Sequence, residues 1–312
     1  MPAYQKGNWD GKIRLFNSKD NTLPKGLLKD LVQKVIGLGI TPKLDDQLKA
    51  SFDQEFIFDE ESMKMKFELR DYQKAMVEFG LTRKRGVCIS ATSSGKSICQ
   101  AALARIFADN GLKVIFIVPN VSLIAQMKSD MIDYFQNAGW SVSDNIHAIS
   151  AGVNKESDKP IILSTWQSLQ RLDPEYFHKF DAVIVDECHL SQATTLTRVI
   201  GSCINAKYKL GFTGTLKGAK SNELSIVGLF GPTKTFVKAK ELIDNGTITP
   251  LKINAIVYKY QEAICKALQS LPYKNEILGI TKSEKRNREL CRHVSELSGN
   301  SLVLVNLVEK HG

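Results

Sequence analysis

The sequence lacks the features that define several large classes of protein. Its 312 residues contain no run of eighteen apolar residues, so no transmembrane helix is expected. The first ten residues hold no apolar segment, which argues against a secretory signal. Six cysteines are present without a C-x-x-C pair, a distribution that favours reduced thiols over disulfides or a zinc site. We therefore expect a cytoplasmic protein with no membrane partner.

The composition is sufficient for sizeable hydrophobic cores and is compatible with a polyanionic partner. Hydrophobic residues make up 43% of the chain, and its length allows two domains. The formal net charge is +9 and the sequence pI is about 9.1, which is compatible with nucleic-acid binding. A basic balance alone is a weak signal, because many proteins carry it without such a partner.

Residues 90–97 form a loop of small residues between an apolar run and a helix-like segment. Residues 86–89 have the apolar, β-branched character of a buried strand, and residues 98–106 have the apolar face of a helix. A strand, a small-residue loop and Gly-Lys-Ser opening a helix are the context of a phosphate-binding loop. Free N–H groups and the helix dipole favour an anion there. Lys96 would reach nucleotide phosphates, and the Ser97 hydroxyl would ligate Mg²⁺.

One departure from the pattern weakens this interpretation. The full motif has a glycine five positions before Gly95, where this chain has Ser90. For the loop taken alone, an ordinary turn that enters a helix is therefore the alternative.

A second motif supports the phosphate loop. Residues 182–185 are apolar and run directly into two carboxylates, Asp186 and Glu187. In phosphate-loop enzymes an Asp at this place helps to hold Mg²⁺, and a neighbouring residue orients the attacking water. The alternative is an exposed acidic turn after a strand. Ninety residues separate Lys96 from Asp186, which leaves room for about two βα units of ~30 residues each.

Residues 66–245 are predicted to form one α/β domain. A strand, a polar tip and a helix recur five times, with further strands at 113–119, 160–163 and 208–212. The pattern predicts a parallel sheet with helices on both faces and with its polar tips at the carboxyl ends of the strands, where ligands bind. Ser122 is suited to capping the helix after the second strand.

Residues 1–65 are expected to form a small α+β accessory domain. A strand at 12–16 and a helix at 27–36 are predicted, and residues 45–63 are interpreted as peripheral structure plus linker. Three side chains here would contact nucleic acid by stacking: Trp9, Arg14 and Phe16. The alternative, an aromatic core of a small domain, fits these residues at least as well.

The order of the motifs resembles that of superfamily 2 helicases. Along the chain they are Arg-Asp-Tyr-Gln, Thr-Ser-Ser-Gly-Lys-Ser, Val-Pro-Asn-Val-Ser-Leu, Ser-Thr-Trp-Gln-Ser, Asp-Glu-Cys-His and Thr-Gly-Thr. Residues 186–189 match the Asp-Glu-x-His branch. The stretch 7–15 and the phosphate loop further resemble the UvsW-type DNA helicases of T-even bacteriophages, a group associated with DNA repair and recombination. The resemblance implies a RecA-like fold for the central domain.

The resemblance also implies residue roles in the nucleotide site. Gln73 would read adenine with Tyr72 beside it, Asp186 would hold Mg²⁺ together with Ser97, and Glu187 would activate water. The phosphate loop would contribute Thr92, Ser93, Ser94, Gly95, Lys96 and Ser97 to ATP binding, with Lys96 counted as catalytic. Residues that would couple the nucleotide state to domain movement are His189, Thr213, Gly214 and Thr215.

A DNA-backbone surface is implied at the tips of the neighbouring strands. Hydroxyl groups and helix starts suit this work, because phosphate contacts need hydrogen-bond donors. Trp166 is equally suited to core packing. The residues implied are Pro119, Asn120, Ser122, Leu123, Thr165, Trp166 and Gln167.

Beyond residue 245 a second, incomplete domain is expected. Residues 207–260 are rich in lysine, which is typical either of a solvated surface or of a groove along a nucleic-acid backbone. Asn245-Gly246 marks a break, so residues 246–312 would be the beginning of a second RecA-like domain, truncated after the family's fourth motif. Its predicted elements are strands at 251–260 and 301–306 and a helix at 283–297.

These observations predict the front portion of an ATP-dependent DNA helicase that couples ATP hydrolysis to unwinding or branch migration. The family's arginine-finger segment, Gln-x-x-Gly-Arg-x-x-Arg, is absent from the sequence. Such a finger is worth about 10³–10⁵ in rate, so this chain alone should bind ATP and single-stranded or branched DNA with weak turnover unless the segment arrives in trans. The alternatives are a nucleotide-gated DNA-binding module without motor activity and a motor subunit of a restriction or remodelling complex.

Overall fold

The computed structural model of the chain describes residues 14–46, 48, 56–150, 152–192, 194–216, 220–250 and 253–304. Its contacts divide the chain into two compact units, Met1–Thr249 and Pro250–Gly312. The described residues of the predicted accessory domain fall within the first unit, and the division into 1–65, 66–245 and 246–312 stays a prediction. Among the residues described, no helix is both long enough and apolar enough to cross a membrane.

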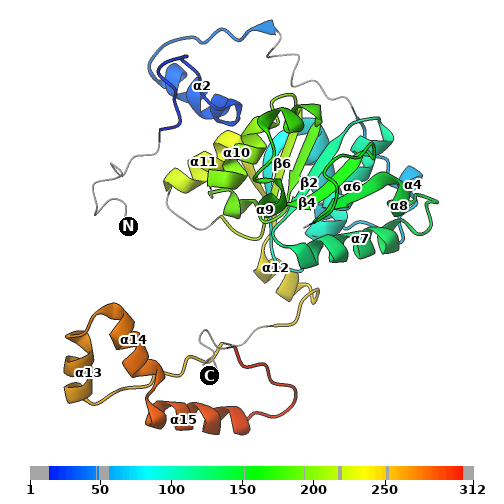
Figure 1. Cartoon of the computed structure of the whole chain (residues 1–312). Coiled ribbons are helices and arrows are strands. Elements are labelled where there is room, and N and C mark those ends of the chain that lie inside the picture. The colour runs from blue at the N-terminus through cyan, green and yellow to red at the C-terminus, as the bar shows by residue number, and fades with distance from the viewer. Residues whose placement is uncertain are drawn as a thin grey trace. The chain divides into compact units, whose positions relative to one another are not determined.

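A seven-stranded parallel sheet lies at the centre of the first unit, in the order β3-β4-β2-β5-β6-β1-β7 (Figure 1). The predicted α/β fold with a parallel sheet is confirmed. The bounds of the strands are Arg85–Ser90 for β1, Val114–Val118 for β2, Ile146–Ile149 for β3, Ile161–Thr165 for β4, Ala182–Val185 for β5, Tyr208–Thr213 for β6 and Thr233–Val237 for β7.

Side-chain alternation explains why helices cover both faces of this sheet. Along β2, Val114, Phe116 and Val118 join one buried cluster, whereas Ile115 and Ile117 join another on the opposite face. Each such side chain contributes about 1.5–3 kcal/mol when fully buried, so a strand apolar on both faces needs a helical layer on each.

Two groups of helices form those layers (Figure 1). The first cluster is completed by α5 (Asp71–Arg83), α6 (Lys96–Asp109), α7 (Val121–Phe135) and α8 (Val142–Asn145). The second is completed by α9 (Trp166–Leu169), α10 (Thr194–Ser202) and α11 (Lys220–Phe230), with the short 3-10 helices η2 (Pro174–Lys179) and η3 (Cys188–Gln192). After β7 the chain continues into α12 (Ala239–Asp244).

The edge strands and one helix cap differ from the sequence-based expectation. No sequence pattern predicts β3 or β7, because both are edge strands with polar or exposed residues in their middle. The predicted cap, Ser122, is wrong: α7 begins at Val121, and the side chain of Asn120 accepts the N–H of Leu123 at 3.1 Å. An asparagine satisfies the free N–H as well as a serine would.

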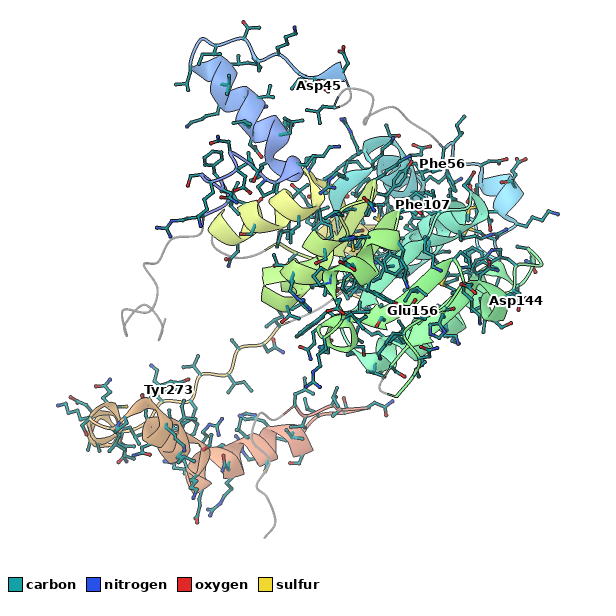
Figure 2. All side chains as sticks on the ribbon, turned by 45° about the horizontal axis from the view of Figure 1, so that its top comes forward. Asp45, Phe56, Phe107, Asp144, Glu156 and Tyr273 are labelled. Atoms are coloured by element: carbon teal, nitrogen blue, oxygen red, sulfur yellow. The ribbon has the colours of Figure 1, made fainter. Side chains whose placement is uncertain are left out.

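The N-terminal residues pack against the sheet domain. The predicted helix appears as η1 (Lys25–Leu27) followed by α2 (Leu28–Gly37), and α4 (Glu60–Met63) comes before α5. The predicted strand at 12–16 lies partly outside the described residues, and residues 14–16 are not in a strand. Phe56 lies beside Phe107 of α6, with ring centroids 6.4 Å apart (Figure 2), and Met63 is buried. The linker interpretation is therefore wrong for residues 56–63, because apolar side chains there complete the core.

The second unit contains three helices among its described residues: α13 (Glu262–Gln269), α14 (Tyr273–Thr281) and α15 (Glu284–Ser295). The predicted helix at 283–297 corresponds to α15, where the Ser283 side chain accepts the N–H of Arg286. The strands predicted at 251–260 and 301–306 are wrong for the residues described there, 253–260 and 301–304, which are irregular. A strand needs a neighbour for its backbone groups, and the described part of this unit offers none.

Candidate nucleotide and nucleic-acid site

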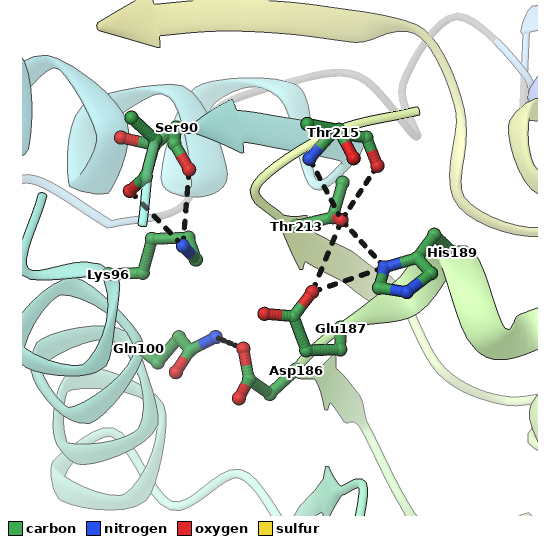
Figure 3. Close-up of polar contacts among 9 residues, drawn as sticks. Ser90, Lys96, Gln100, Asp186, Glu187, His189, Thr213 and Thr215 are labelled. Carbon is green, nitrogen blue, oxygen red and sulfur yellow. Dashed lines mark hydrogen bonds and ion pairs between the residues drawn. The ribbon is translucent and has the colours of Figure 1, made fainter. Parts of the chain in front are cut away.

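Three predicted motifs meet because their strands are neighbours in the sheet. The order β5-β6-β1 places the residues after these strands at one edge, and parallel strands present their carboxyl ends on the same side. The phosphate loop follows β1, the Asp186-Glu187 pair follows β5, and Thr213 ends β6. Figure 3 shows these side chains converging on one space.

The phosphate loop has the backbone that a glycine allows. Gly95 immediately precedes α6 with a φ of 77°, and a Cβ there would lie 2.4 Å from Nε2 of Gln73. The position that departs from the full motif, Ser90, is buried and donates its hydroxyl to Oγ of Ser94 at 2.7 Å. This bond closes the loop across four residues, so the structure accommodates a serine where the motif has glycine.

The side chain of Lys96 lies against the first residues of this loop. Its Nζ donates to the carbonyl oxygens of Ser90 at 3.1 Å and Ala91 at 3.3 Å (Figure 3). The ammonium is therefore held beside the first helical turn, where the N–H groups of α6 have no intrahelical partner. A phosphate bound at this helix start would meet both the helix dipole and a fixed cation.

Tyr72 and Gln73 tie the loop to α5. The Tyr72 hydroxyl and the Gln73 amide nitrogen both donate to the carbonyl of Ser94, each at 2.9 Å. The amide oxygen of Gln73 accepts the N–H of Arg70 at 2.9 Å, and the residue is only 4% exposed. Both ends of the Gln73 amide are thus engaged within the protein, and its role in reading adenine stays a prediction.

Asp186 is held by a residue that the sequence analysis does not single out. Gln100, one turn after Lys96 on α6, donates from Nε2 to Oδ1 of Asp186 at 2.9 Å. Burial raises the pKa of Asp186, and the charge of Glu187 raises it further, while the Gln100 bond and the charge of Lys96 act in the opposite direction. No sequence signal identified Gln100, because only the fold brings α6 beside the end of β5.

Glu187, His189 and Thr213 form a polar triangle. Nδ1 of His189 lies 2.9 Å from the Thr213 hydroxyl and 3.1 Å from Oε2 of Glu187, and the Thr213 hydroxyl lies 3.3 Å from the same oxygen. The backbone φ of Glu187 is 48°, a left-handed value that residues other than glycine rarely adopt. Backbone strain of this kind is found at functional sites. A Cβ on Gly214 would lie 3.4 Å from the hydroxyl of Thr92, so the predicted coupling residues border the phosphate loop.

The oxygen donors present fit a magnesium ion. Asp186 offers a carboxylate, and Ser97 offers a hydroxyl that also accepts from the Tyr134 hydroxyl at 3.3 Å. Within the described ranges no three His, Cys, Asp or Glu residues cluster in a way that would cage a metal. Mg²⁺ is usually held by one or two carboxylates together with substrate phosphates, which matches this donor set.

A groove of about 580 Å³ lies at the carboxyl ends of β2 and β4. It is lined by the predicted DNA contacts Asn120, Thr165 and Gln167, and also by Lys155 and Arg171, which the sequence analysis does not single out. These two cations come from the segments after β3 and α9, and only the fold places them beside the predicted residues.

The other predicted DNA contacts are placed differently. Pro119 accepts the Gln167 amide at 3.4 Å through its carbonyl, and the exposed Ser122 donates to the Asn120 side chain at 2.6 Å. Trp166 is half-buried and packs against the apolar cluster that includes Leu169. The structure therefore gives Trp166 a packing role, and its contact with DNA stays a prediction.

The fold and this site define a phosphate-loop domain of the RecA-like kind. A family model described as "Type III restriction enzyme, res subunit" matches residues 66–218. The ATP-dependent DNA helicase uvsW of Enterobacteria phage T4 is 32% identical over 312 residues, which cover 95% of this chain and 61% of that protein. The DNA 3'-5' helicase XPB of Mycobacterium tuberculosis is 28% identical over 192 residues, which cover 59% of this chain and 33% of that protein.

Solved structures agree with the sequence matches. A crystal structure of T4 UvsW has a TM-score of 0.66 at 29% identity and covers 94% of this chain and 59% of that one. Another, of the UvsW helicase from bacteriophage T4, has a TM-score of 0.64 at 29% identity, with 75% and 86% covered. The chain is similar to the superfamily 2 helicases, and to the UvsW type in particular. It spans 61% of the length of the phage T4 relative.

Proposed function

We propose that this chain is the ATP-binding and DNA-binding portion of an ATP-dependent DNA helicase. One observation carries the proposal: the phosphate loop, the Asp186-Glu187 pair and Thr213 converge at the ends of three adjacent strands. The similarity to a protein named as an ATP-dependent DNA helicase supports it.

The proposed chemistry is hydrolysis of the terminal phosphate of ATP. The N–H groups at the start of α6 and the Lys96 ammonium bind the phosphates, and Ser97 and Asp186 hold Mg²⁺. When bound, Mg²⁺ supplies positive charge to the β- and γ-phosphate oxygens. Glu187 accepts a proton from the attacking water, and its contacts with His189 and Thr213 hold the carboxylate in place.

The DNA backbone is proposed to lie in the groove at the ends of β2 and β4. Asn120 and Gln167 offer donors to phosphate oxygens, and Lys155 and Arg171 supply the charge that such contacts need. Thr165 is only 1% exposed and its hydroxyl accepts the N–H of Ser168, so its contact with DNA stays a prediction. Contacts of this kind carry no sequence preference, so we expect binding to single-stranded and branched DNA regardless of sequence. A location in the host-cell cytoplasm stays a prediction.

Turnover by the chain alone is proposed to be weak. The sequence has no Gln-x-x-Gly-Arg-x-x-Arg segment, and an arginine that neutralises transition-state charge is worth about 10³–10⁵ in rate. A segment supplied in trans, or a second copy of the chain, would provide that charge.

A second candidate function is a motor subunit of a restriction complex. The description of the matching family model favours it, as does a relative in Staphylococcus saprophyticus named as a type I restriction enzyme endonuclease subunit, 24% identical over 248 residues. The UvsW match covers more of this chain at higher identity, so the helicase proposal has the stronger support.

The test is to measure ATP binding and hydrolysis by the 312-residue chain, with and without single-stranded and branched DNA. Lys96→Ala should abolish ATP binding, whereas Lys19→Ala, a change at an exposed turn, should leave it intact. DNA-stimulated turnover that is lost in Lys96→Ala would mean that a complementing arginine arrives in trans. Binding without turnover would mean that the chain needs a partner segment. A wild-type chain that neither binds nor hydrolyses ATP would rule the proposal out.

A further inference from the structure

We propose that Gln100 and Tyr134 are positioning residues that hold the two predicted metal ligands, Asp186 and Ser97. The inference rests on the proposed function, because the two ligands matter only if the site binds Mg²⁺ with a nucleotide. It goes beyond that function by adding two residues that neither the motifs nor the comparisons assign.

Gln100 is a polar residue on an apolar face. It is 1% exposed, and its neighbours Ile98, Cys99 and Ala101 on α6 are all buried against the sheet. Burying an amide costs free energy unless its groups are hydrogen-bonded, so an apolar residue would serve packing alone as well or better. The Gln100 amide instead donates to Oδ1 of Asp186 at 2.9 Å, joining α6 to the end of β5.

That bond fixes the plane of the Asp186 carboxylate. Rotation about the terminal bond of an aspartate is broad, so a donor on one oxygen selects one orientation. A carboxylate has about four lone-pair positions, so accepting from Gln100 leaves positions for a metal ion. Gln100 is also uncharged, whereas a glutamate at this position would place a third carboxylate beside Asp186 and Glu187.

Tyr134 does the same for Ser97. Its hydroxyl donates to the Ser97 oxygen at 3.3 Å, and a serine oxygen has two lone pairs, of which one stays available to a metal ion. The ring is held by an edge contact with Phe67, at a centroid distance of 6.3 Å, and the Tyr134 carbonyl accepts the N–H of Lys66 at 2.9 Å. Tyr134 is therefore a fixed donor from α7.

The experiment measures metal affinity apart from turnover. Mn²⁺ replaces Mg²⁺ as a paramagnetic probe, and its binding to the chain with a non-hydrolysable ATP analogue is followed by electron paramagnetic resonance. Gln100→Met keeps the length of the side chain and removes the donor, and Tyr134→Phe removes only a hydroxyl. Loss of a group that orients a metal ligand costs about 10–100-fold in affinity, so we expect about 10-fold for Gln100→Met. The longer Tyr134 bond should give a smaller loss, of about 3-fold.

Two controls separate positioning from packing. Gln126→Met, at an exposed position of α7, should leave Mn²⁺ affinity unchanged, and binding of the analogue in EDTA should be unchanged in all variants. An unchanged Mn²⁺ affinity in Gln100→Met, with only its melting temperature altered, would overturn the inference. Gln100→Leu serves if the methionine variant does not fold. Failure of the proposed function would look different, because the wild-type chain would then bind no analogue at all.

Discussion

The Nδ1 atom of His189, which follows β5, lies 2.9 Å from the hydroxyl of Thr213. Thr213 ends the neighbouring strand β6 and is 24 positions away in sequence. The same hydroxyl also lies 3.0 Å from the carbonyl of Thr215 and 3.3 Å from Oε2 of Glu187. One hydroxyl proton serves one acceptor at a time, so donation to Thr215 and donation to Glu187 exclude each other. Thr213 is therefore placed to transmit a change at Glu187 to the loop after β6.

Thr213→Val should uncouple DNA binding from nucleotide binding. Valine keeps the shape of the side chain and loses every contact of the hydroxyl, which should also cost about 1–3 kcal/mol of stability because buried groups lose a partner. The measurement is the dissociation constant for single-stranded DNA with and without a non-hydrolysable ATP analogue, whose ratio gives the coupling free energy. We expect the ratio to approach 1 in Thr213→Val while analogue binding persists.

Thr235→Val is the matched control for this prediction, because Thr235 is an exposed residue of β7. A wild-type coupling ratio retained in Thr213→Val would contradict the role of the hydroxyl.

Gly26→Ala should loosen the N-terminal helices from the sheet domain. A Cβ at Gly26 would lie 1.9 Å from the carbonyl oxygen of Val227 and 2.7 Å from that of Gly228, both backbone atoms of α11 that cannot turn away. Limited proteolysis should therefore cut the variant faster around residues 20–45 while the sheet domain stays resistant. Gly37→Ala, at the end of α2 with nothing within 4 Å, is the control and should resist as the wild type does. Equal cleavage of Gly26→Ala and wild type would contradict the observed packing.

The central sheet could be predicted from sequence because its strands are apolar on both faces and end in polar tips. The nucleotide motifs were likewise recognisable, because Lys96, Asp186 and Thr213 each follow a buried run. Short edge strands such as β3 and β7 carry no such signal, since polar residues occupy their middle. The position of each edge strand depends on which neighbouring strand it pairs with.

The parts that escaped prediction depend on contacts between distant segments. Gln100 resembles any helix residue until α6 is placed beside β5, and Phe56 resembles a linker residue until its ring meets Phe107 and Tyr208. Lys155 and Arg171 are ordinary surface cations in the sequence and line the groove only in the fold. For residues 253–260, apolar alternation indicated a strand, but alternation supplies no neighbour to pair with.

Stability should depend on pH through Lys209, whose Nζ donates to the carbonyl of Ile200 at 2.9 Å. Burial, reinforced by the charge of Arg85, lowers its pKa from 10.5 to about 8. Between pH 8 and 10.5 the unfolded chain holds this proton and the folded chain has released it, so Lys209 makes stability rise with pH across that range.

Lys209→Met removes this contribution. The free energy of unfolding of the wild type, measured relative to Lys209→Met by urea denaturation, should increase by about 3 kcal/mol from pH 8 to pH 10.5. Taking the difference cancels other groups that titrate in the same range. A difference that stays constant with pH would contradict the lowered pKa of Lys209.

Arg171→Ala should weaken DNA binding in a salt-dependent manner. Arg171 is exposed and lines the groove at the carboxyl edge of the sheet, beside Thr165 and Gln167, so its guanidinium is placed to neutralise one phosphate. Removing one phosphate contact should reduce the slope of log affinity against log salt concentration by about 1, and affinity should fall alike for all sequences. Fluorescence anisotropy with labelled single strands of two unrelated sequences, from 50 to 200 mM salt, measures both effects. Arg83→Ala is the control, since Arg83 is also exposed but precedes β1 at the opposite edge of the sheet. If Arg83→Ala changed the slope and Arg171→Ala did not, the DNA path would have to lie elsewhere on the domain.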